Sequence, residues 1–321
     1  MGLQVVPQKT EALFMHKKKR GKHGAPPAEA YVTVGDISVR VGDRLKYLGL
    51  YLDAAWSFGG HFERLAPRAE SVAISLSRLL PNLGGPDGLY ANTVRAVAFY
   101  GSPVWADALM AERRGRMLLR RVFRRVAIRV VRGYRTVSHT AATLLAGTPP
   151  VELYADMYAH VYRRTREARR LGVSLTPRVK AAVRLQARRR ALERWDVRPR
   201  DPRDTSGRRV VEAIRPHLVK WADRAGGEMS YRATQVFTGH GCFGSYLCRI
   251  GKEDSARYHH CVLVQIIGET DFSLSSIVAV MLESEESWRA VSSFCEAVML
   301  QEEAERERER LSGGRRRARG R

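Results

Sequence analysis

The hydrophobic pattern of the chain changes once, from strand-like alternation to a helical period. Residues 31–41 alternate apolar and polar side chains around Gly35 and Asp36, which predicts a β-hairpin, and residues 45–52 predict a further strand. From residue 62 onward, apolar residues recur with the spacing of amphipathic helices. Helices are predicted over residues 62–80, 89–100, 112–132, 140–145, 151–171, 210–225 and 285–310. The pattern predicts an α+β fold, predominantly α, in which a small antiparallel sheet precedes helical units.

The clearest predicted helix, residues 112–132, combines an apolar face with a cluster of arginines. The apolar face contains Leu119, Val122, Phe123, Val126, Ala127, Val130 and Val131. The remaining surface carries Arg120, Arg121, Arg124, Arg125, Arg129 and Arg132. Like charges three or four residues apart on a helix repel one another. We therefore expect an anionic partner, such as the phosphates of a nucleic acid, to neutralise these arginines.

The overall charge supports the same interpretation. The 321 residues include 56 Lys and Arg against 33 Asp and Glu, which gives a formal net charge of +23. This balance favours a polyanionic partner, with nucleic acid preferred over an anionic membrane. Arginine dominates the basic residues, and its guanidinium can bind a phosphate through two hydrogen bonds.

Cysteine use and the basic clusters indicate where the protein works. Four cysteines in a chain of this length do not make a disulfide framework, which favours a reducing, intracellular setting. No apolar run is long enough to cross a bilayer, so we expect no membrane partner. The basic clusters at residues 16–23 and 314–321 are typical of nuclear-localisation signals, and we expect the nucleus.

Short motifs occur in a fixed order along the chain. They include KTEALF, KYLGLYLD, YGSPVWADAL, AGTPPVEL and TGHGCFGSYL, at residues 9–14, 46–53, 100–109, 146–153 and 238–247. In this order they resemble the end of the palm, the thumb and the C-terminal tail of the reverse transcriptases of non-LTR (LINE-type) retrotransposons. The resemblance is to the arthropod clade that inserts into ribosomal DNA or telomeric repeats. It implies RNA-directed DNA polymerisation, a nucleotidyl transfer, as the parent activity, and RNA and DNA (template–primer, element RNA, target DNA) as partners.

The catalytic centre of that family is missing from these residues. In the family, an aromatic-Ala-Asp-Asp motif holds the catalytic Mg²⁺ ions shortly before the KTE segment, and no such motif occurs among the 321 residues. We therefore expect a C-terminal fragment that binds template–primer through a basic thumb and is catalytically incompetent by itself. Two alternatives remain open: a stand-alone, non-catalytic nucleic-acid-binding protein derived from the element, and a decayed open reading frame.

The resemblance also implies a division of the chain and assigns roles to individual residues. The expected parts are a palm remnant at 1–61, a helical thumb at 62–160, an Arg-rich helical linker at 161–209, a C-terminal helical unit at 210–311 and a basic tail at 312–321. Lys9 of the KTE segment corresponds to a candidate general acid for the leaving pyrophosphate, which works only in a complete polymerase. Tyr47 and Gly49 correspond to the primer grip, a tight hairpin pressed against the primer end. The alternative is that Tyr47, Leu48 and Leu50 fill a strand core.

A zinc knuckle of the family is degenerate here. Tyr258 stands where the resemblance places the first cysteine, and the stretch that carries the second pair of ligands is missing. A rescued site would draw on Cys242, Cys248, His259 or His260, and Cys261. That spacing is not a specific zinc pattern, so we expect no bound zinc, and no cofactor in this chain, with buried or idle cysteines instead.

Overall fold

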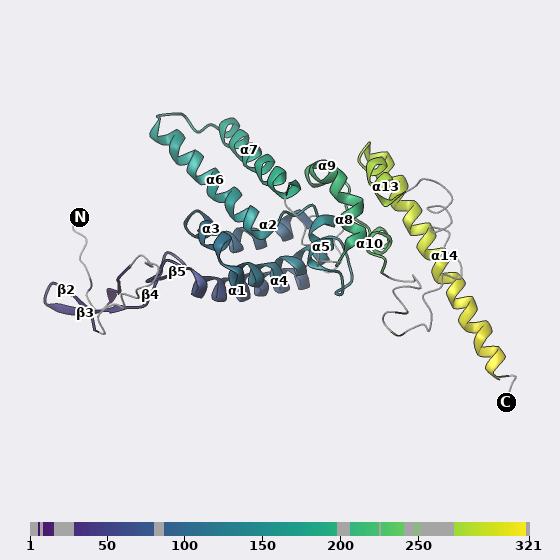
Figure 1. Cartoon of the computed structure of the whole chain (residues 1–321), viewed down its shortest axis with the longest axis horizontal. Coiled ribbons are helices and arrows are strands. Elements are labelled where there is room, and N and C mark those ends of the chain that lie inside the picture. The colour runs from purple at the N-terminus through teal and green to yellow at the C-terminus, as the bar shows by residue number, and fades with distance from the viewer. Residues whose placement is uncertain are drawn as a thin grey trace. The chain divides into compact units, whose positions relative to one another are not determined.

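In a computed structural model of the protein, helices predominate and the strands form small sheets, which confirms the predicted α+β, predominantly α class (Figure 1). The structure describes residues 6, 9–15, 29–79, 87–197, 206–224, 226–240, 248, 251 and 273–318. The described chain divides into two compact units: residues 1–122 with 151–187, and residues 123–150 with 188–321. Residues 62–160 and 161–209 each contribute to both of these units.

The strands lie at the N-terminal end of the first unit. β1 (Ala12–Leu13), β2 (Tyr31–Val34) and β3 (Ile37–Gly42) form a sheet in the order β1-β3-β2, with β1 parallel and β2 antiparallel to β3. The predicted hairpin turn falls at Gly35, whose φ of 60° suits glycine. β4 (Arg44–Tyr47) and β5 (Leu50–Asp53) form a second, two-stranded antiparallel sheet. The single strand predicted over residues 45–52 is therefore wrong, because a turn at Leu48–Gly49 folds it into a hairpin.

The helices of the first unit pack around Trp105. They are α1 (Gly59–Leu79), α2 (Asp87–Ala98), α3 (Ser102–Ala111) and α6 (Val151–Arg170), with the first parts of α4 (Arg113–Val130) and α7 (Pro177–Asp196). α1 packs on α2, and α3 packs on α6. Trp105 is fully buried and donates a hydrogen bond from Nε1 to the Tyr100 carbonyl at 3.1 Å. Residues 100–109, which the sequence assigned to packing at a helix end, form a separate helix that begins after Gly101.

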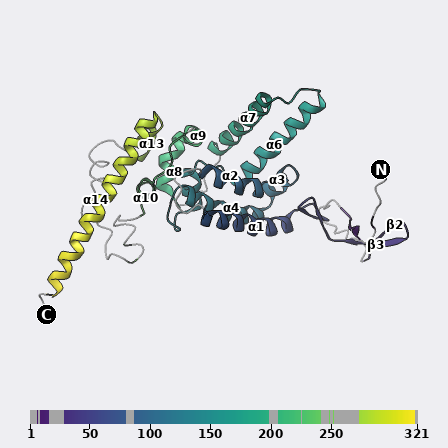
Figure 2. The ribbon, with the colours of Figure 1, turned by 180° about the vertical axis from the view of Figure 1, so that it is seen from behind.

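The second unit is built around another tryptophan. It contains α5 (His139–Leu145), α8 (Arg208–Ile214), the 3₁₀ helix η2 (Arg215–His217), α9 (Leu218–Asp223), α10 (Tyr231–Thr238), α13 (Leu274–Met281) and α14 (Glu285–Ala318). α13 packs against α14 and α8, and Figure 2 shows α13 beside the first turns of α14. Trp221 is fully buried, donates to the carbonyls of Leu144 and Leu145, and packs against Trp288.

Most predicted helices are confirmed, and one is broken. The predicted ranges 62–80, 89–100, 112–132, 140–145 and 151–171 correspond to α1, α2, α4, α5 and α6. The predicted helix over residues 210–225 is instead α8, η2 and α9, because Pro216 has no amide hydrogen to continue the helical ladder. No helix in the described ranges combines the length and the apolar character that a membrane span requires.

Candidate nucleic-acid interface

The tip of the β4–β5 hairpin carries exposed apolar side chains. Tyr47 is 59% exposed and Leu48 is 71% exposed. Leu48 and Gly49 have φ values of 46° and 83°, the left-handed geometry of a tight two-residue hairpin turn. Leucine is unfavourable in this region, where Asn, Asp or Gly is preferred. An exposed leucine in a strained position contributes little to the core, so the tip is a candidate contact site. Of the three residues that the alternative places in a strand core, Leu50 is buried, and Tyr47 and Leu48 are exposed.

The base of the hairpin is seated on the turn between α2 and α3. Leu50 is buried, and its side chain lies so close to Gly101 that a Cβ there would come within 2.5 Å of Leu50 Cδ2. A Cβ on Gly49 would meet Tyr100 Cε1 at 3.4 Å. Glycine at both positions lets the hairpin approach this turn closely, which orients the tip outward.

Asp53 joins the hairpin to α1. Its Oδ1 accepts hydrogen bonds from the amides of Ala55 and Ser57 at 3.0 and 2.9 Å. Its Oδ2 accepts from the Ser57 hydroxyl at 2.9 Å and from the Phe58 amide at 2.7 Å. Trp56 and Phe58 both have positive φ values, of 54° and 59°. The four hydrogen bonds to one carboxylate stabilise this strained turn. They thereby fix the angle between the hairpin and α1, which follows it in the chain.

The other face of the hairpin is basic and aromatic. Lys46 and Tyr51 are directly opposed in the sheet, with Lys46 Nζ 5.7 Å from the centre of the Tyr51 ring. The guanidinium carbon of Arg64, on α1, lies 4.4 Å from the centre of the same ring. Two cations on one ring give a compact positive surface beside the tip. The sequence motif predicted a role for Tyr47 but not for Tyr51. The position of Tyr51 opposite Lys46 in the hairpin could have indicated it.

Lys9 lies in the segment that leads into β1. Its amide donates to the Val6 carbonyl at 3.0 Å, and the residue is exposed. β1 pairs with β3 and also contacts β4, so the strand after Lys9 neighbours the strand that ends at Tyr47. The structure thus places the two motif segments on adjacent strands.

The arginines of α4 fall into two groups. Arg120 is held by Glu152 of α6, whose carboxylate is buried, with a guanidinium–carboxylate distance of 2.6 Å. Arg124 donates to the carbonyls of Val137 and Arg135, which fixes the segment after α4. Both guanidiniums therefore stabilise the fold. Sequence spacing did not predict these contacts, because the partner residues lie 11 to 32 positions away in the chain.

The other arginines of the cluster differ in exposure. Arg121 and Arg125 are exposed and Arg129 is half-buried. Arg132 lies beyond the end of α4 at a φ of 53°, and its guanidinium is 3.5 Å from the carboxylate of Glu228. The predicted apolar face of α4 is buried as expected, except that Val130 is half-buried.

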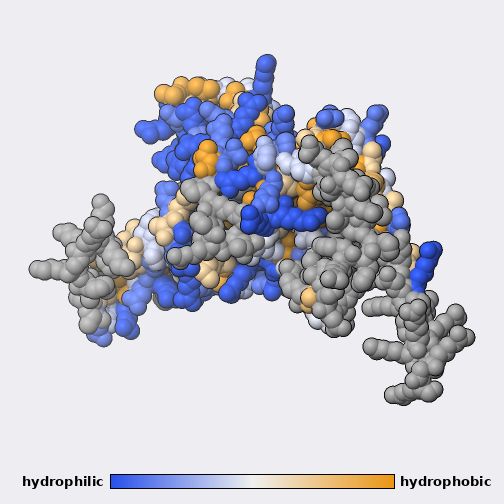
Figure 3. All heavy atoms as spheres, turned by 45° about the vertical axis from the view of Figure 1, so that its right-hand side comes forward, coloured by the Kyte–Doolittle hydropathy of each residue, from blue (hydrophilic) through white to orange (hydrophobic). Residues whose placement is uncertain are grey.

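A denser basic region follows on α6 and α7. Between residues 163 and 197 the chain has 12 basic and three acidic residues. The exposed basic residues include Arg163, Arg164, Arg166, Arg169, Arg170, Arg178, Lys180, Arg184, Arg189 and Arg190. Arg163 and Arg164 have acidic partners, Asp156 at 3.4 Å and Glu167 at 2.7 Å. In Figure 3 the upper left of the molecule is mostly covered by hydrophilic side chains, with hydrophobic side chains along its top edge.

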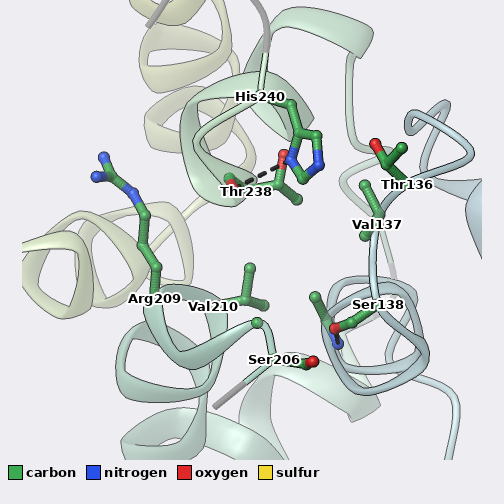
Figure 4. Close-up of a pocket in the computed structure, with 10 residues that line it drawn as sticks. Thr136, Val137, Ser138, Ser206, Arg209, Val210, Thr238 and His240 are labelled. Atoms are coloured by element: carbon green, nitrogen blue, oxygen red, sulfur yellow. Dashed lines mark hydrogen bonds between the residues drawn. The ribbon is translucent and has the colours of Figure 1, made fainter. Parts of the chain in front are cut away.

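A cavity of about 270 Å³ opens inside the second unit (Figure 4). Its lining includes the hydroxyls of Thr136, Ser138 and Ser206, together with His240. His240 Nδ1 lies 3.1 Å from the Thr238 carbonyl, to which it can donate. Arg209 lines the rim, with its guanidinium extended away from the other labelled side chains. Among the described residues that line the cavity, none carries a carboxylate or a thiol.

Of the five candidate zinc ligands, the described residues include Cys248. Cys242, His259, His260 and Cys261 lie outside the described residues. Cys248 is partly exposed, and Cys295 is buried in α14, where burial raises the pKa of its thiol to about 12. Within the described ranges, no three or more His, Cys, Asp or Glu side chains are grouped as metal ligands would be.

Comparison with known proteins relates the chain to proteins of mobile elements. It is 28% identical over 226 residues to a Drosophila melanogaster protein described as a putative 115 kDa protein in the type-1 retrotransposable element R1DM. It is 23% identical over 271 residues to the retrovirus-related Pol polyprotein from the type-1 retrotransposable element R1 4 of Nasonia vitripennis. These alignments cover 63% and 83% of the chain, but 21% and 67% of the two relatives. No protein-family model matches the chain, and no solved structure does.

These relatives define the class of the chain as a retrotransposon-derived protein. More specifically, its relatives belong to R1-type elements of arthropods, which confirms the resemblance to non-LTR retrotransposon reverse transcriptases. The chain spans about a fifth of the Drosophila relative and two thirds of the Nasonia relative.

Proposed function

We propose that this chain binds the phosphate backbone of nucleic acid, as the thumb and C-terminal part of a retrotransposon RNA-directed DNA polymerase. The observation that carries the proposal is the density of exposed basic residues on α4, α6 and α7, since residues 163–197 alone contain 12 basic and three acidic residues. The proposed partners are template–primer, element RNA and target DNA, and the similarity to proteins of retrotransposable elements supports a nucleic-acid partner in general. A protein with these partners works in the nucleus.

The local sequence supports phosphate binding over a merely solvated surface. On α7 the core contacts are confined to the second half, where Ala187, Ala191, Leu192 and Trp195 are buried. The first half exposes Arg178, Lys180 and Arg184 without a nearby acidic residue in the sequence. Like charges at helical spacing oppose helix formation, and a polyanion that releases its counterions on binding offsets this repulsion.

The hairpin tip is the proposed contact with the primer end. Tyr47 offers a ring for a sugar or base, Gly49 allows close backbone approach, and the cations near Tyr51 supply positive charge beside it. In a complete polymerase, Lys9 would stand near the nucleotide phosphates, where an ammonium group neutralises developing charge. Mg²⁺ would then be held by aspartates that these 321 residues do not contain.

The 321 residues are proposed not to polymerise by themselves. Incubation of the purified chain with Mg²⁺, deoxynucleotides and a primed RNA template should leave the primer unextended. Primer extension that depends on this chain, and that survives further purification, would contradict this part of the proposal.

Phosphate binding by α4 is tested by removing its outward arginines. The double variant Arg121→Gln, Arg125→Gln should weaken binding to an RNA–DNA hybrid and make the slope of log affinity against log salt shallower by about two. The matched control, Arg289→Gln, removes a charge from an exposed arginine that is paired with Glu285 on α14. Fluorescence anisotropy measures all three proteins, and an unchanged slope in the double variant would exclude α4 from the interface.

A further inference from the structure

A ladder of aromatic rings leads from the core of the first unit to the surface of α6. Phe99 stacks on Trp105 with ring centres 6.4 Å apart and planes 27° from parallel. The same ring stacks on Tyr154 at 5.6 Å and 25°, and on Tyr158 at 5.5 Å and 21°. Offset stacking of this kind fixes ring orientation as well as burying area. Tyr158 is therefore held rigidly by a ring that is itself buried.

The ladder becomes more exposed along α6. Tyr154, Tyr158 and Tyr162 are four residues apart, a spacing that places them on one face of the helix. Their exposed fractions rise from 4% through 38% to 51%. A core residue is expected to be buried, whereas Tyr158 and Tyr162, one turn apart on α6, are exposed to solvent. The last two positions of the ladder are available to an external partner.

Three arginines lie near this row of tyrosines. The guanidinium carbon of Arg95, on α2, lies 5.0 Å from the centre of the Tyr154 ring. Burial raises the pKa of Tyr158, while the charges of Arg95 and of Arg184, on α7, act to lower it, which places both cations within electrostatic reach of this hydroxyl. Arg166 is one further turn beyond Tyr162 on the same helix and is exposed. Two exposed rings and the exposed Arg166 thus follow one another on one face of α6, with Arg95 and Arg184 near the first of these rings.

We propose that this surface, formed by Tyr158 and Tyr162 with Arg95, Arg166 and Arg184, binds a single-stranded nucleic acid whose bases stack on the two rings. The inference rests on the proposed function and specifies the strand that this part of the interface takes. Bases in a duplex stack on one another and hide their faces, whereas a single strand can turn them onto aromatic side chains. The arginines would bind the phosphates between the stacked bases.

The test compares stacking with charge in the intact 321-residue chain. Tyr162→Leu removes an exposed ring and keeps an apolar side chain, so it should fold normally and bind a labelled 20-nucleotide single-stranded DNA roughly tenfold more weakly. Tyr162→Phe keeps the ring and should bind as the unmodified chain does. Tyr158→Leu should add to the loss, and Tyr31→Leu, which removes a tyrosine 53% exposed on β2, is the matched control with unchanged binding.

The same variants are measured against a duplex of the same sequence. Duplex affinity and the salt slope should be unchanged by Tyr162→Leu, because stacking on a ring releases no counterions. Single-strand affinity equal to that of the unmodified chain in both leucine variants overturns the inference and leaves the proposed function intact. Failure of the unmodified chain to bind either strand form at low salt overturns the proposed function, and the inference with it.

Discussion

Asp53 shows how much one side chain decides in this fold. Its carboxylate accepts hydrogen bonds from three backbone amides and one hydroxyl, and these groups belong to a turn with two aromatic residues at positive φ. One of these, Phe58, is buried and packs edge-on against Trp56 with ring centres 5.0 Å apart. The carboxylate thus stabilises a turn whose backbone is strained at these two non-glycine residues.

Removing that carboxylate should loosen the junction. Asp53→Ala leaves three amides without their acceptor and is expected to lower the free energy of unfolding by about 2–3 kcal/mol. Asp53→Asn, which keeps one carbonyl acceptor, should lose less. Urea unfolding followed by circular dichroism measures both, with Asp36→Ala in the β2–β3 turn as the control. Equal stability of Asp53→Ala and the control would contradict the role assigned to this carboxylate.

His61 makes stability depend on pH. It is buried among Phe58, Phe62 and Trp105, and its Nδ1 accepts from the Tyr51 amide at 3.4 Å. Burial lowers its pKa from 6.5 to about 4. The pKa of His61 in the folded state thus lies below its value in the unfolded state. The contribution of neutral His61 to the free energy of unfolding is therefore complete above pH 6.5 and is lost as the pH falls from 6.5 toward 4.

The loss between neutral pH and pH 4.5 should be on the order of 2–3 kcal/mol for the unmodified chain. His61→Phe cannot titrate and keeps an aromatic ring, so its free energy of unfolding should fall by that much less over the same range. Urea unfolding of both proteins, measured from neutral pH to pH 4.5, gives the difference between their free energies of unfolding at each pH. The titration of the carboxylates is common to both proteins and cancels in this difference. Parallel curves for the two proteins would show that His61 does not carry this dependence.

At the scale of elements, the β4–β5 hairpin combines a poor turn residue with an exposed tip. Leu48→Asn should stabilise the hairpin by about 0.5–1 kcal/mol, because asparagine tolerates the left-handed region. Gly49→Ala should destabilise it, since φ is 83° and the added methyl meets Tyr100. Amide hydrogen exchange in β4 and β5 reports both effects. If Leu48 contacts the nucleic acid, Leu48→Asn should also lower the affinity of the chain for an RNA–DNA hybrid. A Leu48→Asn variant that is more stable and binds the hybrid with unchanged affinity would contradict that role.

The elements that the sequence predicted best are those whose periodicity is strong. α1 and α4 were predicted within a few residues because their apolar faces follow the helical period for five turns or more. The break at Pro216 and the hairpin at Leu48–Gly49 were missed, because the surrounding apolar residues fit an unbroken helix and an unbroken strand. The roles of Arg120 and Arg124 depend on partners brought near by tertiary folding, which no local pattern encodes. Glu152 offers one signal: a carboxylate among Val151, Leu153 and Tyr154 needs a cation.

At the scale of the whole molecule, part of the positive charge holds the protein together. Arg116 donates to the Leu109 carbonyl at the end of α3, and Arg215 donates to the Asp196 carbonyl at the end of α7. Arg224 lies over the rings of Trp221 and Trp288, and burial lowers its pKa to about 10. Such arginines still contribute positive charge to the electrostatic potential of the protein, but their guanidinium groups already make contacts within it.

The salt dependence of binding tests the central claim most directly. The affinity of the 321-residue chain for an RNA–DNA hybrid is measured by anisotropy at salt concentrations from about 50 to about 200 mM. About six phosphate contacts, fewer than the exposed arginines, predict a log–log slope near −5. An affinity that stays constant over this range would contradict phosphate binding as the basis of function.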